Sequence, residues 1–149
     1  MRPRHLCARV GVDVRTTIAG VLMKLGAMMF VTDESDRVTV VARAAEERGF
    51  DSLFVPEKTH VPMSRTTPWP GGELPERYKR CYDPFVALSA AAAVTSGLLL
   101  GTGVALVPLH DPILLAKKAA SLDDMSGGRF VFGVGYGWWR DPLSSVRPL

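Results

Sequence analysis

The sequence predicts an α/β fold in which parallel strands alternate with helices. Apolar runs at 24–31, 51–56, 98–108 and 129–134 have the length and composition of buried strands. Helix-like segments lie between these runs. Buried strands that alternate with helices are typical of a parallel sheet covered by helices. Two architectures satisfy this order: a doubly wound open sheet and part of a (β/α)₈ barrel.

The first helix is expected within residues 32–50, after the strand at 24–31. Acidic residues crowd the predicted first turn, where the helix dipole favours them, and Gly49 lies where a C-terminal cap belongs. The spacing i, i+3, i+4, i+7 puts four apolar side chains on one face. These residues are Val38, Val41, Ala42 and Ala45.

The second strand stops at Pro56, and a loop of proline, glycine and polar residues follows over 56–82. Loops this long inside a compact domain are usually functional or disordered. The next two helices open with the same dipeptide, at Asp83-Pro84 and at Asp111-Pro112. Aspartate accepts a hydrogen bond from a free backbone N–H at a helix start, and proline has no N–H to leave unpaired. Strands follow each of these helices, at 98–108 and 129–134.

The 149 residues suffice for one domain with a real core, and the formal net charge is +3. Four arginines and one aspartate in residues 1–23 account for this charge, so the remainder is neutral. A folded basic face for nucleic acid is therefore not predicted. No run approaches the ~20 apolar residues of a membrane helix, and we expect a cytoplasmic protein. Residues 1–23 are expected to be a leader, disordered or upstream of the true start, and 24–149 a partial barrel domain.

Glycines occupy alternate positions after the fourth strand, at Gly133, Gly135 and Gly137. A dinucleotide fingerprint would need a glycine where Trp138 stands, and it belongs to a first strand. The alternation strips side chains from one face, so that a flat ring can lie close. The alternative is close packing of strands and helices. The sequence shows no metal-ligand spacing, no P-loop and no G-x-S-x-G motif.

The loops after the strands should meet at the C-terminal face of a barrel. Glu57, Lys58 and His60 open the loop after the second strand. Such a group can supply hydrogen bonds and proton transfer. The alternative is a solvated loop mouth.

Three blocks together resemble the luciferase-like monooxygenase family, most closely its branch that uses the deazaflavin coenzyme F-420. They are LFVPEKTHVP, DPFVALSAAAAVTSGLLLGTGVALVP and DPILLAKKAASLDDMSGGRFVFGVGYGW. The resemblance covers residues 24–138 and implies the N-terminal half of a (β/α)₈ barrel, with about four βα units. It also implies a non-proline cis peptide at Gly103-Val104, behind the cofactor ring.

The cofactor-binding positions that the resemblance implies are Glu57, Lys58, Thr102, Gly103, Val104, Gly135 and Gly137. Lys58 stands where the family usually has histidine, and an ordinary lysine stays protonated at neutral pH. A protonated lysine can hydrogen-bond or attract an anionic ring but is a poor proton shuttle, and the nearby His60 is the expected substitute. The candidate catalytic residues are Lys58 and His60. The expected cofactor is coenzyme F-420, with FMN as the alternative, and the expected partner is an organic substrate.

The resemblance implies an oxidoreductase or monooxygenase that passes a hydride between reduced cofactor and substrate, with or without oxygen. The chain supplies about four of the eight units of such a barrel, and a fragment is expected on that ground. The alternative function is a non-catalytic half barrel that binds cofactor weakly or self-associates through its open strand edges.

Overall fold

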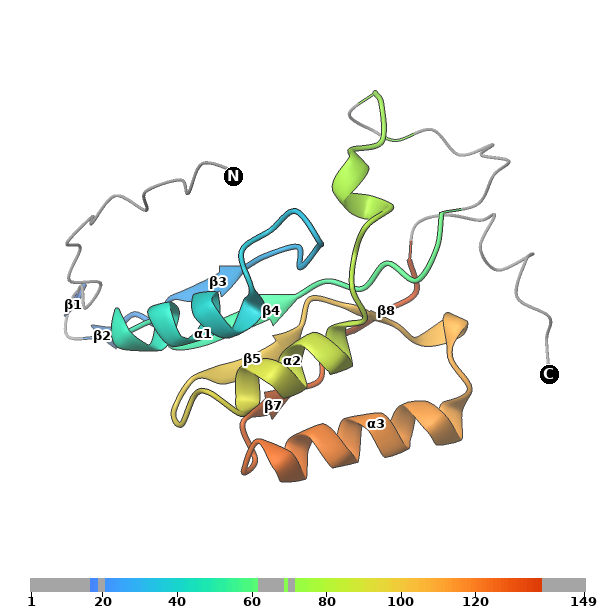
Figure 1. Ribbon diagram of the computed structural model, residues 1–149. Helices are drawn as coiled ribbons and strands as arrows, with labels where there is room; N and C mark the ends of the chain where they lie inside the picture. Colours follow the sequence, from blue (N-terminus) through green and yellow to red (C-terminus); the bar gives the residue numbers. More distant parts are fainter. Residues whose placement is uncertain (1–16, 19–20, 62–68, 70–71, 138–149) are drawn as a thin grey trace.

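The computed structural model of the chain describes residues 17–18, 21–61, 69 and 72–137. Four parallel strands form its central sheet, in the order β3-β4-β5-β7 (Figure 1). They are β3 (Gly26–Met28), β4 (Ser52–Val55), β5 (Leu99–Thr102) and β7 (Phe130–Val131). The predicted four parallel strands are confirmed, in sequence order across the sheet.

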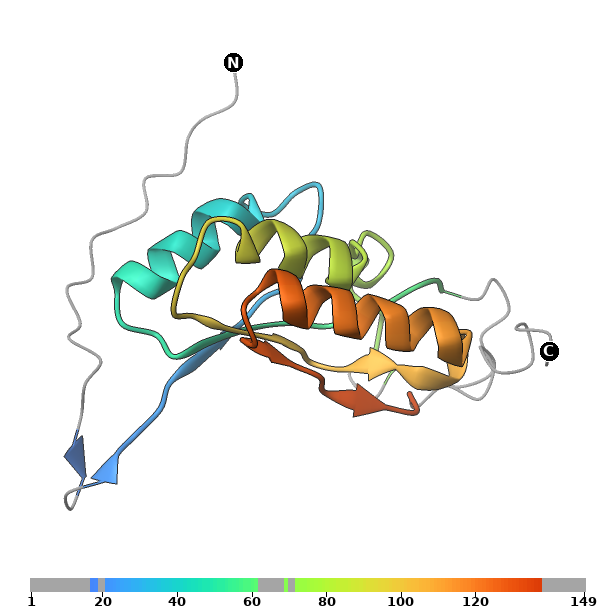
Figure 2. The ribbon, with the colours of Figure 1, turned by 90° about the horizontal axis from the view of Figure 1, so that it is seen from below.

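Three helices connect these strands and lie on one face of the sheet (Figure 2). They are α1 (Val38–Glu47), α2 (Pro84–Ala92) and α3 (Pro112–Met125). The core fills the space between helices and sheet, where Leu53 and Leu100 pack with Leu88 and Leu122. No described helix covers the opposite face, where Met28 is 62% exposed.

Residues 17–22 contain a short antiparallel pair, β1 (Thr17–Ile18) with β2 (Val21–Leu22). The rest of the predicted leader, 1–16 and 19–20, lies outside the described residues, as do 138–149 at the end of the predicted barrel segment.

The third and fourth predicted strands are each interrupted. The run at 98–108 gives β5, then β6 (Ala105–Leu106) and the 3-10 turn η2 (Val107–Leu109). The run at 129–134 gives β7 and then β8 (Val134–Gly135), which pairs in parallel with β6. The third expected strand is interrupted at Gly103, where the backbone bends. The fourth is interrupted at Gly133, whose carbonyl accepts from the Thr102 hydroxyl and the Ala105 N–H. The expectation of two continuous strands is therefore wrong.

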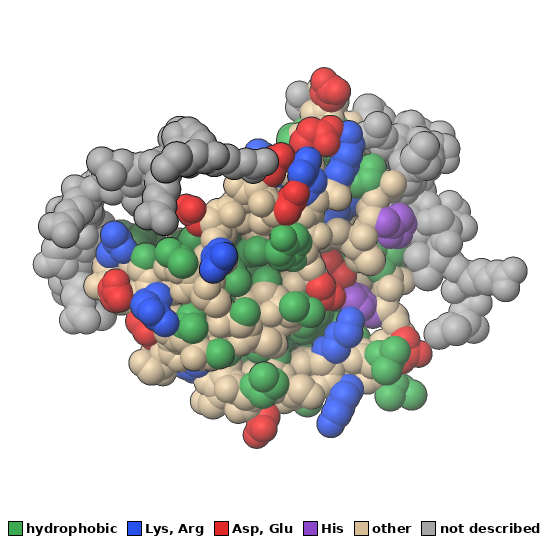
Figure 3. All heavy atoms as spheres, viewed as in Figure 1, with side chains coloured by type: hydrophobic (Ala, Val, Ile, Leu, Met, Phe, Trp, Pro, Cys, Tyr) green, Lys and Arg blue, Asp and Glu red, His purple; other side chains and the backbone are tan. Residues whose placement is uncertain are grey.

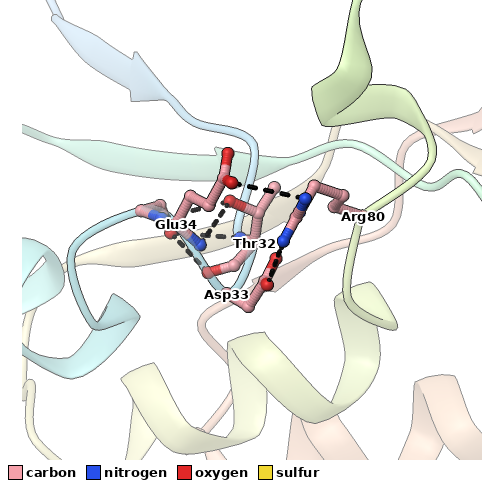
Figure 4. Close-up of polar contacts among 5 residues, drawn as sticks. Thr32, Asp33, Glu34 and Arg80 are labelled. Carbon is pink, nitrogen blue, oxygen red and sulfur yellow. Dashed lines mark hydrogen bonds and ion pairs between the residues drawn. The ribbon is translucent and has the colours of Figure 1, made fainter.

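Helix α1 begins at Val38, six residues later than expected. The acidic residues thus precede the helix, and none lies in its first turn. They belong to a turn in which the Thr32 hydroxyl accepts from the backbone N–H groups of Glu34 and Ser35, at 3.2 and 3.1 Å. Arg80 donates to both Asp33 carboxylate oxygens, at 2.8 and 2.6 Å (Figure 4). These bonds lower the pKa of Asp33 and tie the loop after β3 to the segment before α2.

The two aspartate caps are confirmed. Asp83 accepts from the N–H of Val86 at 3.0 Å, and Asp111 from that of Leu114 at 2.9 Å. Each proline after them opens its helix. The N-termini of α2 and α3 are thus fixed beside the C-terminal ends of β4 and β5.

Arg129 and Glu46 bind backbone at the N-terminal ends of the strands. Arg129 donates to the carbonyls of Ser126, Ala92, Leu98 and Thr95 and to the Thr95 hydroxyl, at 2.7 to 3.2 Å. One oxygen of Glu46 accepts from three successive N–H groups, those of residues 96 to 98, at 2.6 to 3.0 Å. Both side chains hold the loop that leads into β5.

Candidate functional site

The residues predicted to bind a cofactor lie at the C-terminal ends of the parallel strands. Glu57 and Lys58 follow β4, and Thr102 ends β5. Ligands of parallel α/β folds bind at this end, because the loops there vary while the sheet holds them in place. The topology therefore brings two predicted groups close together, one after β4 and one at the break in β5.

Glu57 is the most enclosed charged group of this region, with its side chain 3% exposed. Its Oε2 accepts from the N–H of Leu106 at 2.6 Å. Its Oε1 lies 2.7 Å from His110 Nε2 and accepts from the Thr59 hydroxyl at 2.9 Å. Its backbone N–H donates to the Val104 carbonyl at 3.3 Å. Glu57 thus joins the end of β4 to β6 and η2.

The Gly103-Val104 peptide bond is cis, at the position that the resemblance implies. Val104 is 39% exposed, and its side chain lies against Gly135. Ala105 follows, fully buried, and its N–H donates to the Gly133 carbonyl at 2.8 Å. Residues 103–106 therefore lie against β8 and together with it form the wall of the candidate site.

Thr102 faces the protein interior. Its side chain is buried, and its hydroxyl donates to the Gly133 carbonyl at 2.7 Å. The residue therefore contributes to the wall by pairing two strands rather than by facing solvent.

Two of the alternate glycines, Gly133 and Gly135, lie so close to neighbouring backbone or side chains that a Cβ would clash. A Cβ at Gly133 would lie 2.2 Å from the Thr102 carbonyl oxygen, and one at Gly135 would lie 2.7 Å from a Val104 methyl. Gly137 has a φ of 76°, which favours glycine. Close strand packing, the alternative reading of the pattern, accounts for Gly133 and Gly135 in this fold. Gly135 is half-exposed and Gly137 exposed, so their backbones also border solvent.

A cavity of about 240 Å³ lies on the helix side of the strand ends. Figure 3, viewed from that side, shows acidic, basic and histidine side chains next to one another right of the centre. Four stretches of chain contribute to it. Its lining residues are Glu57, Lys58, Thr59, Cys81, Tyr82, Asp83, Pro84, Leu109, His110 and Lys118.

Lys58 and Cys81 influence one another across this cavity. Burial lowers the pKa of the Lys58 ammonium group, and Cys81 opposes that shift. Burial raises the pKa of the Cys81 thiol, the Glu57 carboxylate adds to the rise, and Lys58 opposes it. The lysine thus releases its proton more readily than a solvated lysine, whereas the thiol holds its proton more firmly.

The candidate catalytic residues are only partly brought together. Lys58 lines the cavity beside Glu57, whereas His60 is half-buried further along the same loop and does not line it. The histidine that meets Glu57 is His110, which the sequence analysis did not select. A signal existed: His110 follows the third strand directly, and parallel topology puts that loop beside the one after the second strand.

The described residues contain no cluster of three or more histidine, cysteine, aspartate or glutamate side chains that could hold a metal ion. Within the same part of the chain, every helix is too short or too polar to cross a membrane.

Comparison with known sequences identifies relatives. The profile of a family described as luciferase-like monooxygenase matches residues 16–143. An uncharacterized protein of Mycobacterium tuberculosis is 46% identical over 125 residues, 81% of this chain and 44% of that protein. Limonene 1,2-monooxygenase of Rhodococcus erythropolis is 41% identical over 74 residues, 44% of this chain and 19% of that enzyme. The chain thus spans less than half the length of the curated relatives it matches.

Solved structures share the fold. A monooxygenase from Streptomyces bottropensis superposes with a TM-score of 0.65 and 28% identity, over 83% of this chain and 36% of that one. The coenzyme F420-dependent tetrahydromethanopterin reductase of Methanopyrus kandleri gives a TM-score of 0.61 and 23% identity, over 81% and 30% of the two chains. These matches confirm the predicted parallel α/β class, a partial (β/α)₈ barrel. With its profile matched over residues 16–143, the chain belongs to the luciferase-like monooxygenase family.

Proposed function

We propose that the chain carries the N-terminal part of the cofactor site of an F-420-dependent oxidoreductase, with FMN as the alternative cofactor. When bound, such a cofactor supplies a hydride for exchange with an organic substrate. The observation that carries the proposal is the break between β5 and β6 at Gly103-Val104, where the partly exposed Val104 lies beside the half-exposed Gly135. A small apolar side chain beside glycine backbone fits the face of a flat ring. We propose Gly103, Val104, Gly135 and Gly137 as the ring-contacting positions.

Solved relatives of the same fold support both cofactors. One is an F420-dependent secondary alcohol dehydrogenase in complex with an F420-acetone adduct, at 22% identity. Another is the oxygenating constituent of 3,6-diketocamphane monooxygenase in complex with FMN, at 19% identity. F-420 is our first choice because the sequence blocks resemble the deazaflavin branch most closely. With either cofactor, molecular oxygen is a further candidate reactant.

Lys58 and His60 are the proposed groups for charge and proton handling. A protonated Lys58 attracts an anionic ring or substrate, and burial brings its pKa closer to neutrality. This shift makes Lys58 a better proton carrier than a solvated lysine. His60 lies two residues further along the loop, and an imidazole is a common general acid or base. We place the reaction in the cytoplasm.

A second candidate function is a half barrel that self-associates through its strand edges. Among the described residues, β3 pairs only with β4, and β7 only with β5. Met28 on β3 and Val131 on β7 are 62% and 38% exposed. Unpaired edges with apolar side chains favour pairing with another chain. Sedimentation of the purified chain tests this: a single monomeric species at all concentrations would contradict it.

A thermal melt of the purified full chain tests the cofactor proposal. We expect one cooperative transition that rises with oxidised F-420, because a ligand specific to the native state stabilises it by mass action. A rise with FMN alone would replace F-420 by FMN. A transition that moves with neither compound at high concentration would contradict cofactor binding, and turnover with reduced F-420 would then not be expected.

A further inference from the structure

We infer that Glu57 and His110 form a buried positioning pair, which holds the backbone of residues 104–106 in place without touching the cofactor. The inference rests on the proposed function for its effect on cofactor binding, and on the structure alone for its effect on the backbone. It assigns to His110 a role that the sequence analysis did not foresee. It also moves Glu57 from direct cofactor contact to support of the wall.

The first step is that the Glu57 carboxylate has little capacity left for a ligand. Oε2 accepts from the Leu106 N–H at 2.6 Å, and Oε1 is engaged by His110 at 2.7 Å and Thr59 at 2.9 Å. The carboxylate is 3% exposed and the His110 side chain 11%. A carboxylate that is buried and hydrogen-bonded through both oxygens is held by the protein and not offered to a ring.

The second step is that Glu57 forms hydrogen bonds with the wall at two residues, Val104 and Leu106. Its backbone N–H donates to the carbonyl of Val104, and its side chain accepts from the N–H of Leu106. These contacts lie on either side of the buried Ala105, whose own N–H is bound by Gly133. Strand β6 has only two residues and pairs only with β8 among the described strands. Glu57 is thus a main support of this short segment.

The third step is that His110 fixes the carboxylate. His110 lies immediately after η2 and before the Asp111 cap of α3. Its Nε2 bond holds Glu57 Oε1 on the η2 side, so Oε2 stays directed at Leu106. The rings of His110 and Phe85 of α2 also pack in a T-shaped arrangement, with centroids 6.2 Å apart. The pair therefore transmits the position of α2 and α3 to the wall.

The chain contains a matched control. Glu46 also binds backbone N–H groups through its carboxylate, those of residues 96 to 98. It does so at the N-terminal end of the sheet, away from the wall. A general loss of stability caused by removal of a carboxylate clamp should appear in Glu46 variants as well, whereas a change at the wall should not.

The experiment compares amide hydrogen exchange and cofactor affinity in the full chain. The variants are Glu57→Leu, Glu57→Gln, His110→Phe and the control Glu46→Gln. In Glu57→Leu, we expect exchange of the Leu106 amide to accelerate about tenfold or more, because a hydrogen bond to a charged group is lost. We expect the dissociation constant of oxidised F-420, or of FMN if that is the ligand, to rise by a similar factor. His110→Phe should give smaller effects in the same direction.

If Glu57→Leu does not fold, His110→Phe still tests the proposal. Glu57→Gln is the conservative variant. Its amide oxygen can still accept from Leu106, so it should rescue most of the Leu106 protection. The control should leave both readouts at wild-type values while lowering the melting temperature. Unchanged Leu106 exchange in His110→Phe, and in Glu57→Leu where that variant folds, would overturn the positioning pair. Faster exchange with unchanged affinity, in a chain that binds cofactor, would overturn the effect of the pair on cofactor binding.

Failure of the proposed function has a different signature. If the wild-type chain binds neither F-420 nor FMN, the cofactor proposal falls. The exchange of Leu106 then still decides whether Glu57 and His110 hold the wall, because this measurement needs no ligand.

Discussion

The two ends of the sheet use charged side chains in different ways. At the N-terminal ends of the strands, Arg129 and Glu46 form hydrogen bonds with the backbone of the loop before β5. At the C-terminal ends, Lys58 and Cys81 line a cavity and shift each other's pKa, and His110 lines the same cavity while bonded to Glu57. The comparison teaches that charged side chains hold backbone at both ends, since Glu57 and His110 do so at the C-terminal end as well, and that Lys58 at this end lines a cavity.

Arg129→Met should have the largest effect on stability. The substitution keeps much of the side-chain volume but leaves the carbonyls of Ala92, Thr95, Leu98 and Ser126 without this donor. We expect a loss of about 3 kcal/mol in the free energy of unfolding, measured by urea titration. Arg129→Lys should recover only part of it, because an ammonium group cannot reproduce the guanidinium fork. A loss below about 0.5 kcal/mol, which is typical of ordinary surface substitutions, would contradict a stabilising role of Arg129 at the N-terminal ends of the strands.

Gly133→Ala tests whether close strand approach governs the other end. The new Cβ would lie 2.2 Å from the Thr102 carbonyl oxygen, so the backbone must move, at a cost of about 2 kcal/mol. Gly97→Ala is the matched control, since its Cβ meets only a Glu46 oxygen at 3.7 Å. Urea titration of both variants measures the difference. Equal stability of the two would show that the wall tolerates a side chain at residue 133.

Glu46→Gln should cost about 1 kcal/mol at neutral pH, through weaker acceptance from three N–H groups. The N–H groups of residues 96 to 98 lower the pKa of Glu46 from its ordinary 4.5 in the folded chain. A lowered folded pKa means that the carboxylate stabilises the fold above pH 4.5 and that this contribution is lost as the pH falls through the folded pKa. The gap between wild type and variant in thermal melts should therefore shrink below about pH 4.5. A constant gap would contradict an ionised clamp.

Lys58→Met should have the smallest effect on stability, and of the opposite sign. Burial lowers the folded pKa of Lys58, so the protonated lysine opposes folding at neutral pH. Because Lys58 is partly exposed, solvent screens this effect, and the gain at pH 7 should stay below about 0.5 kcal/mol. The gain should fade as the pH rises toward 10.5, where the unfolded lysine also loses its proton. Urea titrations across this pH range, in a Cys81→Ala background that removes the thiol titration, measure the trend. A less stable variant at pH 7 would place Lys58 among the structural charges.

The local features of the chain were predictable because their causes lie within a few residues. The caps at Asp83 and Asp111 follow from a dipeptide, and the apolar face of α1 from its spacing. The start of that helix was misplaced because the acidic residues before Val38 are engaged in a turn with Arg80, 47 residues from Asp33. Short-range patterns do not contain that partner.

The site was predictable in its location but not in its contacts. Parallel topology alone puts the loops after β4 and β5 at one end of the sheet, so Glu57 and Lys58 were predicted from their positions after a strand. Gly103 was predicted from the family resemblance. The bond between Glu57 and His110 joins residues 53 apart, and the contact of Gly133 with Thr102 joins residues 31 apart. Alternation of glycines is compatible with a ring or with a neighbouring strand, and only the neighbour's placement distinguishes them.

The sequence by itself determined the order of strands and helices, the helix caps and the end of the sheet where chemistry belongs, because hydrophobic period and capping act over one or two turns of chain. The tertiary structure decided which polar groups meet there. In the folded chain, Glu57 bonds with Leu106 and His110, and the Thr102 hydroxyl donates to Gly133. Lys58 interacts electrostatically with Cys81. These contacts join segments that are far apart in the sequence. Their relative positions are set by side-chain packing and not by local propensity.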